Sequence, residues 1–456
     1  MTENKAIFET MPIGKALAYL AIPTIISQLI TMIYNLADTF FIGQTNDPLK
    51  IAATSVAFNL VFLMNALSNL FGIGGGSLIS RLLGLNKEEE AKKVFALSIF
   101  GTIAVTILYS SIILIFMDPI LRLLGASNET IGYAKKYTLW VAIIGSLPCT
   151  LSMTMAHLLR SEGYTKHASV GLGMGGILNI ALDPLFMFVI LPQGNEVLGA
   201  AIATMTANIC SLIYFCIVFI MLKNKAILSI NPKLLPSSFN HLKSVFAVGF
   251  PSALGSALAC FSSIIMNNLS SNYGDIPVAA VGIVKKIDML PTNVGMGLCQ
   301  GMMPLVAYNY STKNYKRMRA AARYARISGI IFALLCVLSF ELLAPQIVSL
   351  FIKEEETLSL GTNFLRICCL ATPLMIINFQ MSYMFQAMGK GPQSLILSSL
   401  RQGLINMPLL FIMNAIAGLY GVVWTQLLSD SITLIISFSL YHVTYKKILL
   451  LEAASS

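Results

Sequence analysis

Long apolar runs dominate this chain and restrict what it can fold into. Only 11% of its 456 residues are charged and 56% are hydrophobic, whereas a soluble domain carries about 25% charged residues. A helix that crosses a hydrocarbon layer about 30 Å thick needs roughly 20 apolar residues. The sequence therefore predicts an all-α polytopic membrane protein with twelve transmembrane helices. The expected spans are 14–42, 51–82, 91–117, 130–158, 165–191, 197–222, 241–271, 276–308, 319–342, 357–388, 391–415 and 418–445.

The loops between these spans alternate in charge. Every second loop is rich in Lys and Arg, and the loops between them are poor in both. Basic loops remain in the cytoplasm, so we expect an even number of spans with both chain termini cytoplasmic. The net charge of +10 is explained by these short loops, and no basic patch or arm indicates a nucleic-acid partner. The basic loops contain residues 81–93, 160–166, 223–243, 313–326, 390 and 446–447.

The second half of the chain repeats features of the first at a shift of roughly 225 residues. The paired features are Pro23 with Pro251, Gly72–Gly76 with Gly297–Gly301, Pro148 with Pro373, Gly163 with Gly389, and Pro184 with Pro408. Because both halves begin on the same side, the repeats are parallel, as in transporters that bind substrate between two repeats. We expect two pseudo-symmetric six-helix lobes, 1–222 and 241–456, joined by a cytoplasmic linker at 223–240.

Few acidic residues lie inside predicted spans, where an ionisable group indicates function by default. They are Asp38, Asp183, Asp288 and Asp430. Tyr34 precedes Asp38 by one helical turn, so its hydroxyl is placed to donate to the carboxylate. Asn179 precedes Asp183 in the same way. Pro184 removes a backbone N–H and frees a carbonyl one turn earlier. The alternative is that either carboxylate is an ordinary residue at the outer membrane interface.

Oxygen ligands on neighbouring helix faces suit Na⁺ or a proton relay. Thr204 and Ala200, one turn apart in the sixth span, could add a hydroxyl and a carbonyl to the oxygens of Asp38, Asn179 and Asp183. Other embedded charges have simpler interpretations. Asp288 can pair with Lys285 three residues earlier, and Asp430 can pair with a neighbouring helix or face the cytoplasm.

Several motifs exclude other kinds of site. Gly72–Gly76 follows no strand and precedes no GK[ST], so it indicates close helix packing and not a phosphate loop. The eight cysteines form no CxxC pair and no cluster with histidine, so we expect packing residues. No hydrolase, zinc-protease or kinase motif is present. We therefore predict neither an enzyme nor a resident cofactor.

The motifs resemble those of the multidrug and toxic compound extrusion (MATE) transporters over nearly the full length of the chain. The chain has Asp38 and Asp183 in its first half and no embedded carboxylate in its seventh and tenth spans. In this respect it resembles the DinF-type or MepA-like bacterial branch of the family. The matching motifs are Pro23 with Tyr34-Asn35-x-x-Asp38-Thr39, Gly72–Gly76, Leu159-Arg160-Ser161-Glu162-Gly163, Asn179-x-x-x-Asp183-Pro184 and Gly199-Ala200-Ala201-x-Ala203-Thr204.

The resemblance implies a monomeric exporter of the bacterial inner membrane that exchanges H⁺ or Na⁺ for lipophilic organic cations. It also implies an N-lobe cation site formed by Asp38, Asn179, Asp183 and Thr204, with Tyr34 nearby. In the mechanism we expect, cation binding bends the first span near Pro23, with Pro184 as a second hinge, and releases the drug. An adaptable wall for the drug is expected from Met296, Met303, Gln380, Met381 and Phe385, together with Asp288.

A flippase of lipids or lipid-linked oligosaccharides from the same superfamily is the alternative function. Such a protein would need embedded cationic residues for a pyrophosphate group, and Lys285, Arg366 and Arg401 are candidates.

Overall fold

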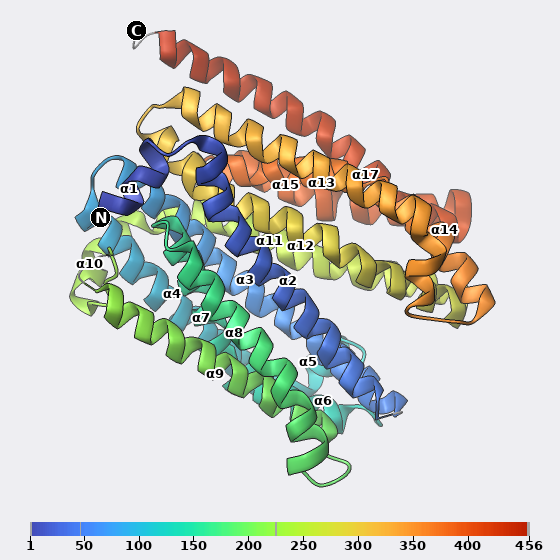
Figure 1. Cartoon of the computed structure of the whole chain (residues 1–456). Coiled ribbons are helices and arrows are strands. Elements are labelled where there is room, and N and C mark those ends of the chain that lie inside the picture. Colours follow the sequence, from blue (N-terminus) through green and yellow to red (C-terminus); the bar gives the residue numbers. More distant parts are fainter. Residues whose placement is uncertain (1, 46, 224–225, 454–456) are drawn as a thin grey trace.

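The computed structural model describes residues 2–45, 47–223 and 226–453, and this part of the chain is helical with no strand (Figure 1). The first half contains α1 (Thr2–Glu9), α2 (Ile13–Gly43), α3 (Pro48–Gly84), α4 (Glu88–Ile115), α5 (Met117–Leu123), α6 (Ile131–Thr138), α7 (Ser146–Ser161), α8 (Thr165–Pro184) and α9 (Glu196–Leu222). The second contains α10 (Leu235–Ser238), α11 (Leu242–Ser271), α12 (Asp275–Ser311), α13 (Tyr315–Ser349), α14 (Glu355–Cys369), α15 (Thr372–Ala387), α16 (Gly391–Ser399) and α17 (Asn406–Ala453).

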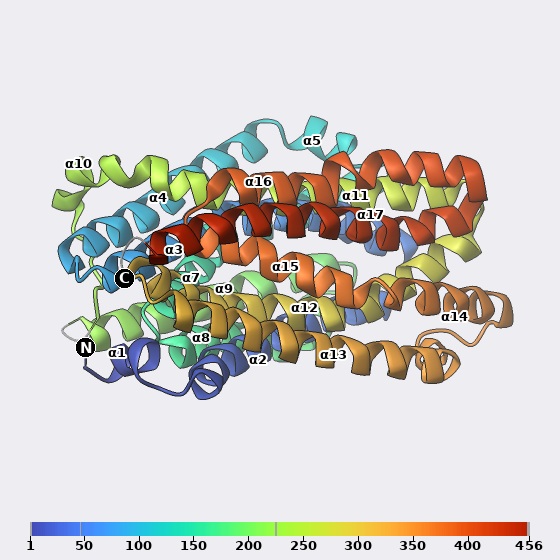
Figure 2. The same cartoon turned by 90° about the horizontal axis from the view of Figure 1, so that it is seen from above.

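These helices account for all twelve predicted spans. By length and composition, eight described helices could cross a membrane, or up to ten if each of two bent pairs is one span. One of the eight, Gly391–Lys446, holds two passes, because the chain breaks at Gly418 (φ 58°) and turns back (Figure 2). The remaining span is α12, which carries Lys285, Lys286 and Asp288 and nevertheless packs beside α2.

The outer surface of the bundle is apolar, as contact with lipid requires. Along α13, for example, the side chains of Ile331, Leu334, Leu338 and Leu342 are each more than half exposed. Soluble monomers rarely expose apolar patches of this extent. The exposed surface therefore agrees with a membrane-embedded protein.

The helices form two lobes, and the separation between the lobes changes from one end of the bundle to the other. Both termini lie at one end of the bundle, and from that end α2–α9 and α11–α17 diverge (Figure 1). Among the described residues, the hydrogen bond between the lobes that lies farthest from the termini runs from Cys260 Sγ to Asn59 Oδ1. Nearer the termini the lobes are linked by Ser77 Oγ, which donates to Gln386 O at 2.6 Å.

Glycine brings the lobes together at the end with the termini. A Cβ atom on Gly74 or Gly249 would collide with the backbone of the facing helix, Val245 or Leu70 respectively. A Cβ atom on Gly297 would lie 2.8 Å from Ile25 Cα, and one on Gly301 would collide with Ala21. The prediction that Gly72–Gly76 serves close packing is confirmed. The corresponding glycines of the second half do the same.

The short helix α1 lies across this closed end and contacts both lobes. Its Phe8 ring stacks on Tyr308 of α12, with 5.0 Å between ring centroids, and lies beside Gly163 of the N-lobe. The Arg317 guanidinium of α13 donates to the carbonyl oxygens of Ile7, Phe8 and Met11 at 2.6–3.2 Å. The carbonyls of Ile7 and Phe8 belong to the C-terminal turn of α1, where no intrahelical donor remains, and that of Met11 follows the helix.

Replacing Arg317 by leucine is expected to detach α1 from the closed end. The three carbonyl groups would lose charge-assisted hydrogen bonds, each of which stabilises by about 1.5–3 kcal/mol. Amide hydrogen exchange in residues 6–11 should become at least about tenfold faster. Arg323→Leu, at an exposed position of the same helix, should leave exchange unchanged. Equal exchange in the two variants would show that Arg317 does not hold α1.

Candidate functional site

The N-lobe brings the predicted polar residues together from three helices. Asn179 and Asp183 lie one turn apart on α8, and Asn179 Nδ2 donates to Asp183 Oδ1 at 3.2 Å. The same amide donates to Thr204 Oγ1 of α9 at 3.1 Å. Asp38 of α2 is close enough for its charge to act on Asp183. The sequence therefore identified a cluster that exists in the structure.

Acceptor oxygens in this cluster lack donors. Asp183 is fully buried and Asp38 is 8% exposed. Asp183 Oδ2, Asp38 Oδ1 and Asn179 Oδ1 are buried atoms without a hydrogen-bond partner. Neither carboxylate forms an ion pair with a described residue. Buried carboxylates are costly unless a charge or proton neutralises them, so the cluster is suited to bind a cation.

The hydroxyl beside Asp38 differs from the predicted one. Tyr137, a buried residue of α6, lies within hydrogen-bonding reach of both Asp38 and Thr204. The Tyr34 hydroxyl lies within electrostatic range of Asp38 and Asp183 but donates to neither carboxylate in the described chain. The expected donation from Tyr34 to Asp38 is therefore wrong in this conformation. Ala200 lies one turn before Thr204, fully buried in an apolar cluster with Tyr137.

The helices around the cluster are locally irregular. A π-helical segment, Leu185–Ile190, follows Pro184, and another, Leu139–Ile144, follows α6. Such segments occur mostly where a helix is distorted, often at functional sites. Pro23, by contrast, lies inside an uninterrupted α2. The structure thus shows a distortion at the predicted hinge Pro184, and a regular helix at Pro23.

The C-lobe also has a buried acidic residue, but it is neutralised. Asp430 of α17 is fully buried, and Arg401 Nε donates to its Oδ1 at 2.6 Å. Gln426 Nε2 donates to Oδ2 at 2.6 Å, and Asn378 Nδ2 donates to Oδ1 at 3.1 Å. The Arg401 guanidinium also covers the Phe379 ring, 4.4 Å from its centroid. Of the two interpretations of Asp430, pairing with a neighbouring helix is confirmed.

The expected ion pair between Lys285 and Asp288 is wrong. Lys285 Nζ donates instead to Ser263 Oγ at 2.9 Å and to Asn267 Oδ1 at 3.1 Å on α11. Lys285 borders a C-lobe pocket of about 150 Å³ that contains no carboxylate among its lining residues. Asp288 is partly buried and lies within electrostatic range of Arg401.

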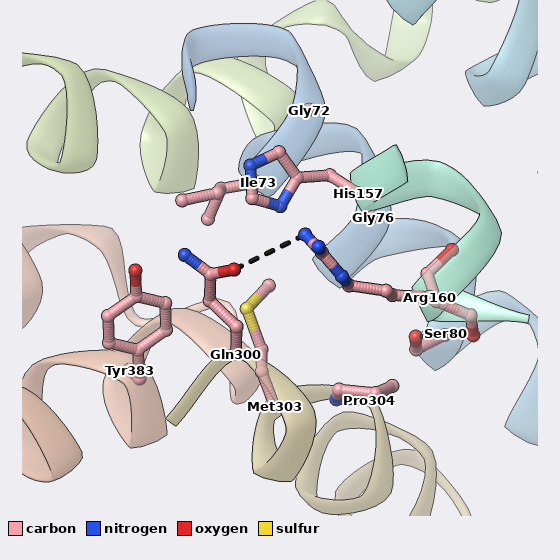
Figure 3. A pocket seen from close by; sticks show the side chains of 11 residues that line it. Gly72, Ile73, Gly76, Ser80, His157, Arg160, Gln300, Met303, Pro304 and Tyr383 are labelled. Carbon is pink, nitrogen blue, oxygen red and sulfur yellow. Dashed lines mark hydrogen bonds between the residues drawn. The ribbon is translucent and has the colours of Figure 1, made fainter. Parts of the chain in front are cut away.

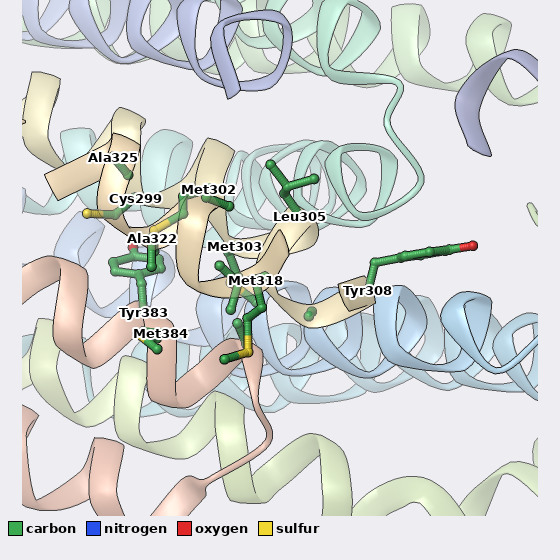
Figure 4. Close-up of a cluster of buried hydrophobic side chains, with 14 of the residues drawn as sticks. Cys299, Met302, Met303, Leu305, Tyr308, Met318, Ala322, Ala325, Tyr383 and Met384 are labelled. Atoms are coloured by element: carbon green, nitrogen blue, oxygen red, sulfur yellow. The ribbon is translucent and has the colours of Figure 1, made fainter. Parts of the chain in front are cut away.

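Most of the predicted drug-contacting residues are enclosed in this conformation. Met303 lines a small cavity between the lobes (Figure 3). Met303, Met381 and Phe385 belong to a buried apolar cluster around α12 (Figure 4). Gln380 is 1% exposed and accepts a hydrogen bond from Arg326 Nε at 2.9 Å. Met296 is only partly buried.

The site offers oxygen ligands suited to hard cations. Among the described residues, no group of three or more His, Cys, Asp or Glu side chains could hold a metal ion. The N-lobe cluster instead combines two carboxylates, a carboxamide and a hydroxyl. Oxygen ligands of this kind suit hard cations, whereas softer metals are bound by thiolate or imidazole groups.

Two helical lobes and one buried, unneutralised carboxylate cluster define a polytopic membrane transporter built from parallel repeats. The chain belongs to the MatE family of MATE transporters, whose family model matches residues 23–185 and again residues 251–412. The double match agrees with the repeat predicted from sequence.

Individual relatives are similar over almost the whole chain. The multidrug export protein MepA of Staphylococcus aureus is 33% identical over 93% of this chain and 92% of its own. MepA of Staphylococcus saprophyticus is 29% identical over similar shares, 93% and 92%. An outward-facing multidrug resistance MATE transporter shares the fold with a TM-score of 0.91 at 24% identity, covering 98% of this chain and 99% of that structure.

Proposed function

We propose that this chain is a secondary active antiporter that exports lipophilic organic cations in exchange for H⁺ or Na⁺. The observation that carries the proposal is the pair Asp38 and Asp183. Both are buried without an ion-pair partner, whereas the buried C-lobe acid is neutralised by Arg401. The names of the MepA relatives support multidrug export.

The proposed cycle follows from the charge of the N-lobe. With both carboxylates ionised, the negative charge of the N-lobe favours an organic cation. A proton or Na⁺ at Asp38, Asn179, Asp183 and Thr204 removes that negative charge and favours release of the drug. The ion drives transport only because it binds the two conformations with different affinity. Bending of α2 near Pro23, and of α8 at Pro184, would connect ion binding to the drug-contacting wall. That wall includes Met296, Met303, Gln380, Met381, Phe385 and Asp288.

The orientation in the membrane follows from the loop charges. The termini share one end of the bundle (Figure 1), and the basic loops predict that this end is cytoplasmic. We infer a multi-pass protein of the bacterial inner membrane that acts as a monomer. Lobes closed at the cytoplasmic end correspond to an outward-facing state.

The test is ethidium efflux from proteoliposomes with a proton gradient or a Na⁺ gradient imposed separately. Ethidium efflux by wild type should depend on one of the two gradients, and that dependence identifies the coupling ion. Asp38→Asn and Asp183→Asn should each lower gradient-driven efflux by at least about tenfold, and the double variant should abolish it, because a neutral amide cannot exchange a proton or supply charge to Na⁺. Asp275→Asn, at an exposed position, is the control.

Full efflux by the double variant would refute the mechanism. Wild type without efflux under either gradient would refute the antiporter and favour a lipid substrate. Two of the three cations considered for that alternative have an acidic partner, because Arg401 is paired with Asp430 and Arg366 Nε lies 3.8 Å from Glu341 Oε2. Lys285, by contrast, bonds only Ser263 and Asn267 among the described residues.

A further inference from the structure

A small cavity lies between the lobes near the end with the termini. It has a volume of about 20 Å³ and is bordered by α3 and α7 of the N-lobe and by α12 and α15 of the C-lobe (Figure 3). A cavity of this size holds about one water molecule or one monatomic ion. It lies apart from the Asp38 and Asp183 cluster, none of whose residues line it.

Arg160 supplies a buried positive charge to this cavity. The side chain belongs to a residue only 4% exposed, and it donates to Gln300 Oε1 at 3.2 Å and to Ser27 Oγ at 3.3 Å. Its Nε–H has no partner. No carboxylate of the described chain forms an ion pair with it. A guanidinium remains protonated in proteins, and burying such a charge unpaired is costly.

His157 adds one further N–H donor to the cavity, since a neutral imidazole has one donor and one acceptor nitrogen. Its imidazole occupies space that glycine leaves free, since a Cβ atom on Gly72 would lie 2.9 Å from His157 Cδ2. In the described part of the chain the ring has no hydrogen-bond partner, and it lines the cavity beside Arg160. Figure 3 shows the imidazole and the guanidinium on the same side of the cavity, facing Gln300.

Hydrogen-bond donors from both lobes border the cavity. Arg160 and the His157 ring come from the N-lobe, and the Gln300 amide and the Tyr383 hydroxyl come from the C-lobe. The Gln300 carbonyl oxygen already accepts from Arg160. A positively charged, donor-rich cavity of one-ion size selects a small anion over a cation.

We propose that this cavity binds one chloride ion, which neutralises Arg160 while the lobes are closed at this end and leaves when they separate. The ligands come from both lobes, so only the closed arrangement assembles the complete site. By linkage, chloride then favours the closed arrangement. The cavity shares no residue with the proposed cation site and shares Met303 with the proposed drug-contacting wall.

The experiment measures thermal unfolding of the purified full chain as chloride replaces gluconate at constant Na⁺ and constant ionic strength. Chloride should raise the unfolding temperature of wild type and saturate, and bromide should do the same. Arg160→Gln should abolish the response, and Tyr383→Phe should weaken apparent chloride affinity by about tenfold through loss of one donor to a charged group. Arg122→Gln changes an exposed residue at the opposite end of the bundle, so this variant should retain the response to chloride.

The outcomes separate clearly. If wild type responds equally to chloride and gluconate, the cavity holds only water and the proposal is wrong. If Arg160→Gln does not fold, the graded response of Tyr383→Phe decides. An unchanged chloride affinity in Tyr383→Phe and in His157→Gln would place any chloride effect elsewhere and would also overturn the proposal.

Discussion

Gly301→Ala should lower ethidium efflux by roughly 5- to 150-fold, although it adds only a methyl group. That methyl group would collide with Ala21 of α2 across the lobe interface. Overpacking of this kind costs about 1–3 kcal/mol, and here the cost falls only on the arrangement in which the lobes are closed at this end. A bias of that size shifts a two-state equilibrium by the stated factor.

The control for this prediction lies on the same helix. A Cβ atom on Gly282 of α12 would meet nothing within 4 Å, and alanine in a helix is favoured over glycine by about 1 kcal/mol. Gly282→Ala should therefore transport at the wild-type rate. Efflux measured at equal protein levels compares the two variants. Normal efflux by Gly301→Ala would show that the tight approach of α2 and α12 is not needed in the cycle.

Arg401→Met should destabilise the protein by about 3–5 kcal/mol, because it leaves the buried Asp430 carboxylate without its counter-charge. Restoring neutrality with the second substitution Asp430→Asn should recover much of that loss. Thermal unfolding in detergent measures both changes. If the single and double variants are equally unstable, packing of Arg401 on Phe379, and not the charge, is what stabilises this region.

The matched control is the exposed pair formed by Arg366 and Glu341, whose side chains are 44% and 40% exposed. Exposed pairs contribute about 0–1 kcal/mol, so Arg366→Met should barely shift the unfolding temperature. A large effect there would contradict the assignment of the Arg401 effect to burial.

Helix positions could be predicted from the sequence because the bilayer fixes the length of each apolar run. The fourth predicted span, 130–158, matches α6, a π-helical segment and α7, although these bend by 46°. Hydropathy does not predict this bend between the two helices. The reversal between the last two spans was predicted, and Gly418 provides the positive φ that it requires.

Contacts within one helix were more predictable than contacts between helices. Asn179 and Asp183 are neighbours because they are four residues apart on α8. Tyr137 was missed because its place beside Asp38 depends on how α6 packs against α3 and α9. The only available signal was a tyrosine within an apolar span. Lys285 likewise donates to Ser263 and Asn267 of the neighbouring helix α11, and not to Asp288 three residues away on its own helix.

The position of α1 has a consequence for how this protein can be handled. Because α1 is bound to Arg317 on one side and lies against Gly163 on the other, it spans the seam between the lobes, which opens in every turnover of the proposed cycle. A bulky fusion partner placed ahead of it would be carried at that seam. We expect such a fusion to slow turnover even when folding and membrane insertion are normal, so a reporter domain belongs elsewhere on the chain.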